Sequence, residues 1–322
     1  MSSGLGDGVR DSGSHAYQIG RAALGGSATI VVRDRRGATT LEALAGTAPA
    51  SVVELIEQWG QWEGTIESLL EKSGSRGLDF SKLEWLSPVM PRKLICIGAN
   101  YSDHNREMPG AVSTPVPYSF MKPPTTALIG SGRTIRLPEH AAKIDYEAEL
   151  AVVIGRHAHR VPSESALSFV FGYSVLNDVS ARDWMPAESP LGPDWTMLKG
   201  FDESAPMGPW ITPAKFVPDP QNLDISLSVN GRVKQDSNTS QMIFTVAQVI
   251  QHLASLMTLE PGDVIATGTP SGVGFGRKPQ EFLKPGDHIR VEIEGLGVLE
   301  NSIAAIERDP SPSRAATRAA HA

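Results

Sequence analysis

The chain has 322 residues, of which 40% are hydrophobic, and its formal net charge is −7. This charge and the lack of a Lys/Arg cluster argue against nucleic acid or an anionic membrane surface as a partner. The longest apolar runs are far too short to span a bilayer, and the single cysteine, Cys96, excludes a disulfide framework and fits a reducing compartment. We therefore expect a soluble, cytoplasmic protein.

The N-terminal stretch predicts a leader followed by an accessory domain. Residues 1–14 are rich in Gly and Ser, lack the apolar segment of a signal peptide, and predict a disordered leader. Further on, the segment ATIVVRD (28–34) predicts a strand, and residues 51–72 carry apolar side chains at helical spacing. Because no chemistry is apparent before residue 90, residues 15–90 are predicted to form a small accessory domain.

From residue 91 the pattern changes to short strands separated by Gly and Pro. Strands are predicted at LICIGA, YSFM, TALIG, AELAVVIG and FGYSVLNDVS, and a hairpin at 224–235 that turns at Asn230-Gly231. Residues 244–260 predict the clearest helix of this half. The body, residues 91–306, is therefore predicted to be a β-rich α+β domain, and residues 307–322, which lack apolar periodicity, a disordered tail.

Two glutamates, Glu147 and Glu149, stand two residues apart in KIDYEAELAVVIG, just before a continuous apolar run. In a strand both carboxylates would lie on one face, roughly 6.5–7 Å apart along the chain. Like charges beside a core repel each other unless a cation lies between them; the alternative is a strand whose polar face meets solvent. Asp178, at the end of the strand in FGYSVLNDVSARD, adds a third carboxylate, and such a set is typical of a hard divalent cation.

The segment GANYSDHNREMPG (98–110) places His104 three residues before Glu107. On one helical turn these side chains would be neighbours, and a carboxylate beside an imidazole fixes its tautomer and raises its basicity. This is the arrangement of a general base, with Asp103 able to cap the turn. The alternative is a polar loop without a catalytic role.

Taken in order, the segments NYSDHNREM, MKPPTTALIG, DYEAELAVVIG, NDVSARD, WTMLKGFD, MGPW, VNG and ATGTPSGVG resemble the fumarylacetoacetate hydrolase family. The resemblance covers residues 91–305 and is greatest to the acylpyruvase and bacterial ring-cleavage-pathway branch. It implies a mixed, mostly antiparallel β-roll, a homodimer, and a small-molecule oxo acid as substrate.

The resemblance also implies roles for individual residues. The metal ligands for Mg²⁺ or Mn²⁺ fall on Glu147, Glu149 and Asp178, and the catalytic dyad of a lid falls on His104 and Glu107. The catalytic lysine falls on Lys199. The substrate-binding positions fall on Arg182, Met185, Gly268 and Thr269.

Met185 departs from the family pattern, because many members have a glutamine at this position that contacts substrate or the activated water. A thioether donates no hydrogen bond. Either the substrate is less polar at that point, or the segment PAESPLGPD (186–194) supplies the contact.

The activity that the resemblance implies is metal-dependent cleavage of a carbon–carbon bond in an acylpyruvate or related 2,4-dioxo acid, to pyruvate and a carboxylic acid. His104 would deprotonate the attacking water, and Lys199 would stabilise the alkoxide. Two alternatives stay open: an isomerase or decarboxylase of an unsaturated oxo-diacid, and a metal-binding scaffold without turnover. A scaffold would need only the three carboxylates and neither the dyad nor the lysine.

Overall fold

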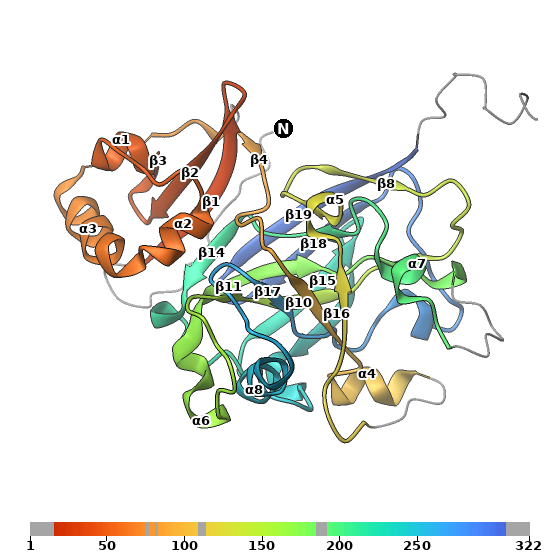
Figure 1. Cartoon of the computed structure of the whole chain (residues 1–322). Helices are drawn as coiled ribbons and strands as arrows, with labels where there is room; N and C mark the ends of the chain where they lie inside the picture. The colour runs from red at the N-terminus through yellow and green to blue at the C-terminus, as the bar shows by residue number, and fades with distance from the viewer. Residues whose placement is uncertain (1–15, 75–76, 81–82, 109–113, 185–191, 307–322) are drawn as a thin grey trace, which may run out of the picture.

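The computed structural model describes residues 16–306, with gaps at 75–76, 81–82, 109–113 and 185–191 (Figure 1). The leader 1–14, the tail 307–322 and Met185 therefore lie outside the described residues. Within the described part of the chain, no helix combines the length and the apolar character needed to cross a membrane.

The N-terminal elements form the lobe drawn in red and orange in Figure 1. Three antiparallel strands are followed by three helices and a short strand that returns to pair with β1. Their bounds are β1 Tyr17–Leu24, β2 Ser27–Asp34, β3 Gly37–Thr40, α1 Leu41–Ala45, α2 Val52–Glu57, α3 Trp59–Lys72 and β4 Glu84–Trp85. The predicted strand 28–34 is confirmed, and the predicted helix 51–72 is present but divided at Gln58, whose backbone leaves helical geometry (ψ 16°).

The largest sheet joins this lobe to the rest of the molecule. Its strand order is β3-β2-β1-β14-β11-β10-β17-β5-β6, and the link is the antiparallel pair of β1 with β14. All pairs in it are antiparallel except β17 with β5. The remaining strands are β5 Leu94–Gly98, β6 Tyr118–Lys122, β10 Ala148–Ile154, β11 Val170–Asn177, β14 Trp210–Pro213 and β17 Val264–Ala266. Every residue of β10 and β11 is buried, which explains their almost continuous apolar sequence.

A second sheet has the order β16-β15-β18-β19-β8. Its strands are β8 Thr134–Leu137, β15 Asp224–Val229, β16 Arg232–Asn238, β18 His288–Ile293 and β19 Gly297–Ala305. The predicted hairpin is confirmed, because Asn230 and Gly231 join β15 to β16 with φ of 51° and 74°. Two positive φ values in succession are what a tight two-residue hairpin turn requires.

Helix α8, Val246–Leu256, lies inside the predicted range 244–260. Thr245 and Gln248 form a capping box at its start, which satisfies backbone donors that the first helical turn leaves free. The other helices of this part are α4 Ser102–Glu107, α5 Pro124–Ala127, α6 Ser163–Ala166 and α7 Trp195–Lys199. The short strands are β7 Leu128–Ile129, β9 Ile144–Asp145, β12 Ser180–Ala181 and β13 Ala205–Pro206, and the 3-10 turns are η2 Leu167–Phe169, η3 Arg182–Trp184, η4 Ala214–Phe216, η5 Thr239–Gln241 and η6 Gly274–Gly276.

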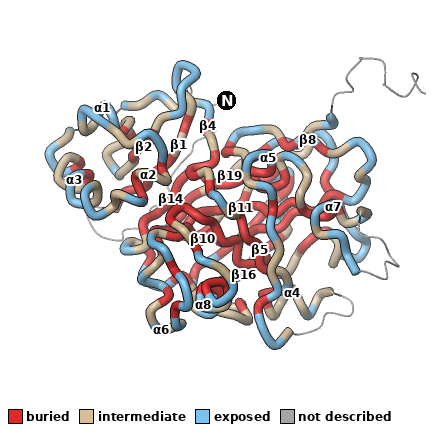
Figure 2. The backbone as a smooth tube through the Cα atoms, in the orientation of Figure 1, coloured by how far each residue is buried: buried red, intermediate tan, exposed pale blue. Residues whose placement is uncertain are grey.

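The largest core cluster lies between the two sheets, and a second one lies between the large sheet and helices α1–α3. Figure 2 shows the buried backbone concentrated on β10, β11 and β14. The predicted α+β, strand-rich and mostly antiparallel fold is confirmed. Because β10 and β11 are buried along their whole length, any charged side chain at their ends is held inside the protein. A buried charged site can therefore form at the ends of β10 and β11.

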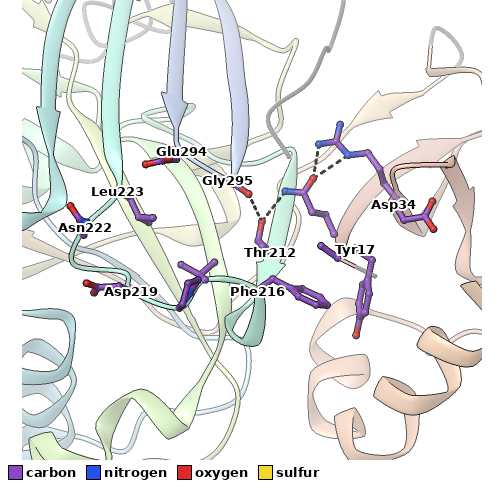
Figure 3. A pocket seen from close by; sticks show the side chains of 14 residues that line it. Tyr17, Asp34, Thr212, Phe216, Asp219, Asn222, Leu223, Glu294 and Gly295 are labelled. Carbon is purple, nitrogen blue, oxygen red and sulfur yellow. Dashed lines mark hydrogen bonds between the residues drawn. The ribbon is translucent and has the colours of Figure 1, made fainter. Parts of the chain in front are cut away.

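A polar junction fixes the N-terminal strands to the larger body (Figure 3). A cavity of about 350 Å³ opens there between β1, β2, β14 and residues 216–223. On its wall, Gln18 Nε2 donates to Thr212 Oγ1 at 2.8 Å, and Gln18 Oε1 accepts from Arg33 Nη2 at 2.5 Å. The side chain of Gln18 thus links β1 and β2 to β14 within the large sheet.

Candidate metal centre and active site

Three buried carboxylates, those of Glu147, Glu149 and Asp178, meet at one end of the large sheet. Each offers an oxygen atom within 4.8 Å of the others. The register explains the convergence: Ala148 of β10 lies opposite Asn177 of β11, so the residues beside them are neighbours. Asp178 N also donates to Glu147 O at 2.9 Å. We call these three residues the acidic cluster.

Three basic side chains contact the acidic cluster. Lys199 Nζ lies 2.6 Å from Glu147 Oε2 and 2.7 Å from Asp178 Oδ2. Arg182 Nη2 lies 2.5 Å from Glu147 Oε1, and Lys122 Nζ donates to Asp178 Oδ1. Glu149 has none of these contacts; its Oε2 accepts from the backbone N–H of Gly268 at 2.8 Å.

Electrostatics therefore distinguish the two glutamates. Burial alone would raise the pKa of Glu147, but the charges of Lys199 and Arg182 lower that pKa to about 2. Burial, followed by the charges of Asp178 and Glu147, raises the pKa of Glu149 well above its ordinary value. The charge of Lys199 and the N–H of Gly268 offset this increase in the pKa of Glu149 only in part.

These features fit a divalent cation. The cluster offers buried carboxylate oxygens, which are the ligands that hard cations such as Mg²⁺ and Mn²⁺ prefer, and the charge of one of its carboxylates, that of Glu149, is only partly balanced by its neighbours. The cluster can therefore hold a divalent metal with Glu147, Glu149 and Asp178 as ligands.

The backbone at Gly268 supports this arrangement. Gly268 has a φ of +97°, and a Cβ there would lie 2.9 Å from Asn100 Cβ. Only glycine fits such a position without strain. The close approach brings the Gly268 N–H to Glu149, while the next residue, Thr269, accepts from Gln235 Nε2 through Oγ1 at 2.8 Å.

His104 and Glu107 lie on α4 and face each other, with 2.9 Å between Nδ1 and Oε1. The second oxygen of Glu107 accepts from Gly272 N at 2.8 Å, so the carboxylate is held from two sides. Asp103 does not cap this helix, contrary to the prediction: Tyr101 is the N-cap, and Asp103 Oδ2 accepts from Ser237 and Ser271 instead. Asp103 therefore ties α4 to the second sheet.

One cavity, of about 260 Å³, contains both the acidic cluster and His104. Arg182, Lys199 and Thr269 also line it, so seven of the ten predicted site residues lie around a single cavity. Gly268 and Glu107 are not among the described lining residues, but they contact Glu149 and His104, which are. Met185 is outside the described residues.

The walls of this cavity are apolar and aromatic. Phe120 and Trp195 stack with ring centroids 5.0 Å apart and an interplanar angle of 18°. Lys199 Nζ lies 5.4 Å from the Phe120 ring centroid, and the Arg182 guanidinium lies 5.8 Å from that of Phe275. Among the described lining residues, the only lysine or arginine side chains are those two.

Two further residues of the site were missed by the sequence analysis. Lys122, at the end of a strand, has no local pattern that predicts its contact with Asp178. Asp145 is fully buried; it accepts from Arg182 Nε at 3.0 Å and from the N–H groups of Gly274 and Phe275. The opposite charges of Asp145 and Arg182 make such a pair possible, but nothing in the sequence predicts that the two side chains lie close together.

Comparison with known proteins places the chain in one enzyme family. The sequence model of the Fumarylacetoacetate (FAA) hydrolase C-terminal family matches residues 93–304, and the chain belongs to this family of enzymes. The chain is 40% identical over 272 residues to the mitochondrial oxaloacetate tautomerase FAHD2A of Bos taurus, a match that covers 83% of this chain and 84% of the relative.

Solved structures with the same fold carry different activities in their names. A fumarylacetoacetate hydrolase from Exiguobacterium antarcticum is 33% identical with a TM-score of 0.77, and covers 90% of this chain and 100% of its own. A 5-carboxymethyl-2-hydroxymuconate delta-isomerase from Mycobacterium smegmatis is 32% identical with a TM-score of 0.68 and the same coverage. Family membership therefore leaves hydrolase, isomerase and tautomerase chemistry to be distinguished.

Proposed function

We propose that this protein is a divalent-metal-dependent enzyme that interconverts the enol and keto forms of a 2-oxo acid of the oxaloacetate type. The observation that carries the proposal is the His104–Glu107 pair in the same cavity as the acidic cluster. The similarity to an oxaloacetate tautomerase over most of both chains supports it.

A cation held by Glu147, Glu149 and Asp178, with Mg²⁺ and Mn²⁺ the best fits, would withdraw electrons from the oxo group and acidify the protons on the neighbouring carbon. His104 is placed to move such a proton. Because Nδ1 faces the Glu107 carboxylate, it carries the ring hydrogen, and Nε2 is left as the acceptor. Nε2 would take a proton from C3 of the keto acid and return it to the oxygen at C2, which gives the enol.

Lys199 would support the charge that develops on that oxygen. Its ammonium group is buried, lines the cavity, and donates to Glu147 and Asp178. A preorganised donor of this kind stabilises an oxyanion most strongly where bulk water is excluded.

A second candidate is the hydrolysis of an acylpyruvate, and the apolar wall of the cavity favours it. Phe120 and Trp195 would receive an uncharged acyl group. In this reaction His104 would deprotonate a water, whose oxygen attacks the distal carbonyl; cleavage of the carbon–carbon bond would then release a carboxylic acid and the enol form of pyruvate. His104 and Lys199 would have the same roles in both reactions, and the structure of the substrate would determine which reaction occurs.

The experiment that tests the proposal offers the purified protein, with Mg²⁺, both oxaloacetate and a series of acylpyruvates. Decay of the enol absorbance of oxaloacetate reports tautomerisation, and mass spectrometry of the products reports cleavage or decarboxylation. We expect accelerated enol–keto interconversion that a chelator abolishes. Cleavage of acylpyruvates without tautomerisation would replace the first candidate by the second, and the absence of both activities would refute the proposal.

A further inference from the structure

Lys122 is a buried lysine that contacts the acidic cluster but is not among the described residues that line the cavity. It ends β6, which lies at the edge of the large sheet, and its neighbour Met121 is 48% exposed, whereas Lys122 is 1% exposed. Its Nζ donates to Asp178 Oδ1, to Val179 O at 3.1 Å and to Ser204 O at 2.6 Å. An ammonium group has three donors, so all of them are used. Lys122 therefore has no donor left for a substrate.

Two lysines divide the oxygens of Asp178 between them. Lys122 contacts Oδ1, and Lys199 Nζ lies 2.7 Å from Oδ2. Lys199 lines the cavity, whereas Lys122 is not among the described residues that line it. Oδ2 of Asp178 is thus contacted by a lysine that lines the cavity, whereas Oδ1 is contacted by a lysine that does not.

Lys122 also joins the segments that carry the site. Ser204 O, which accepts from Lys122, accepts from Val179 N at 2.9 Å as well. The hydroxyl of Ser204 donates to Lys199 O at 2.9 Å. One buried ammonium group therefore connects the end of β6, the segment after β11 and the turn after α7.

We propose that Lys122 is a positioning residue, which holds Asp178 so that only Oδ2 is presented to a cation in the acidic cluster. The inference rests on the cation site of the proposed function. The rival role is that of a simple counter-charge to the cluster.

The two roles predict opposite effects on metal affinity. Removing a positive charge from beside three carboxylates strengthens their attraction for a cation. Releasing Asp178 from its fixed orientation weakens binding, and the loss of a partner that orients a metal ligand typically lowers metal affinity by about 10–100-fold. The sign of the change therefore separates positioning from charge balance.

The experiment measures the Mn²⁺ affinity of the metal-free, full-length protein by following the electron paramagnetic resonance of free Mn²⁺. We expect Lys122→Met to bind Mn²⁺ about 10–100-fold more weakly than wild type. Lys122→Arg keeps the charge, but its planar fork cannot reproduce three donors that diverge from one nitrogen, so we expect it to weaken binding too. Unchanged or tighter binding by Lys122→Met, or full affinity in Lys122→Arg, would overturn the proposal. If Lys122→Met does not fold, Lys122→Arg decides.

Lys93→Met is the matched control. Lys93 Nζ lies 2.8 Å from Oδ2 of Asp263, a fully buried aspartate, and neither residue is among the described lining of the cavity. Its Mn²⁺ affinity should equal that of wild type; a loss as large as that of Lys122→Met would mean that the effect is not specific. If wild type itself binds no Mn²⁺, the cation site of the proposed function fails, whereas wild-type binding with an unaffected Lys122→Met refutes only the role of Lys122.

Discussion

The N-terminal lobe meets the body through an aromatic interface made by Tyr17, Trp59, Phe171 and Phe216, whereas the acidic cluster is made of buried charges. Within the aromatic interface, the ring centroids of Trp59 and Phe171 lie 4.8 Å apart, and those of Tyr17 and Phe216 lie 5.1 Å apart. These contacts remove apolar surface from water, which stabilises the fold. In the acidic cluster, carboxylates are removed from water, which is unfavourable unless partners compensate.

Stability and chemistry are therefore located in separate parts of the molecule. The cluster is incompletely compensated in the protein alone, because Glu149 lacks the basic partners that Glu147 has. A bound cation would complete it. Substitutions in the two regions should therefore have separable effects on metal binding, activity and stability.

The largest effect is expected from removal of a ligand. Glu147→Ala, Glu149→Ala and Asp178→Ala should each abolish activity and greatly weaken Mn²⁺ binding, because each removes a charged oxygen donor. Titration calorimetry and turnover assays measure the two effects. Full turnover of the wild-type protein in excess chelator would show that the cluster is not a catalytic metal site.

The second-largest effect is expected from removal of the base, His104. His104→Ala should lower tautomerisation or hydrolysis by about 10²–10⁴-fold while Mn²⁺ affinity stays at the wild-type value, since the imidazole is not among the proposed ligands. Glu107→Ala should lower the rate less, because Glu107 only orients the ring. Decarboxylation of oxaloacetate depends mainly on the cation and should be much less affected. Wild-type rates in His104→Ala would remove it from the mechanism.

At the aromatic interface, a substitution is expected to affect stability alone. Phe171→Ala should lower the free energy of unfolding by about 3–5 kcal/mol, because it removes a buried aromatic ring and leaves a cavity. Urea denaturation of the metal-free protein measures this loss. Mn²⁺ affinity under native conditions should not change, and a parallel fall in affinity would mean that the two regions are coupled.

The smallest expected effect is an increase in stability, in contrast to the loss expected for Phe171→Ala. Glu149→Gln should stabilise the metal-free protein at neutral pH by on the order of 1 kcal/mol, because it removes a buried charge that lacks a basic partner. The raised pKa of Glu149 means that the penalty is absent below the ordinary value of 4.5 and grows as pH rises above it. The gain should therefore disappear as pH falls toward that value.

Glu147→Gln is the control for the direction of this change in stability. The pKa of Glu147 is lowered to about 2, so its ionised form stabilises the fold above the ordinary value of 4.5, and that contribution is lost as pH falls toward 2. At neutral pH, Glu147→Gln should be less stable than wild type. Thermal melts in excess chelator compare both variants, and the same direction of change in both would contradict the distinction between the two glutamates.

The sequence predicted the local geometry of the site well, because short periodicities carry it. A spacing of two residues near a strand brought Glu147 and Glu149 together, and a spacing of three residues on one turn brought His104 to Glu107. The Asn-Gly pair likewise predicted its hairpin turn from backbone conformation alone.

Long-range contacts could not be predicted in this way. The acceptors of Lys122 at Val179 and Ser204 lie 57 and 82 residues away, and no periodicity links them. The pair of Ile19 with Ile211, which joins the lobe to the large sheet, depends on two strands far apart in the chain. The break at Gln58 was also hidden, because the apolar spacing continues through it.

Deuterium incorporation at C3 of oxaloacetate, followed by NMR in heavy water, reports directly on a metal-dependent proton transfer by His104. The reaction requires a base that moves a proton at that carbon and a cation that acidifies it. We expect wild-type protein with Mg²⁺ to accelerate the exchange, and either excess chelator or His104→Ala to return it to the background rate. Exchange that continues undiminished under both conditions would contradict a metal-dependent proton transfer by His104.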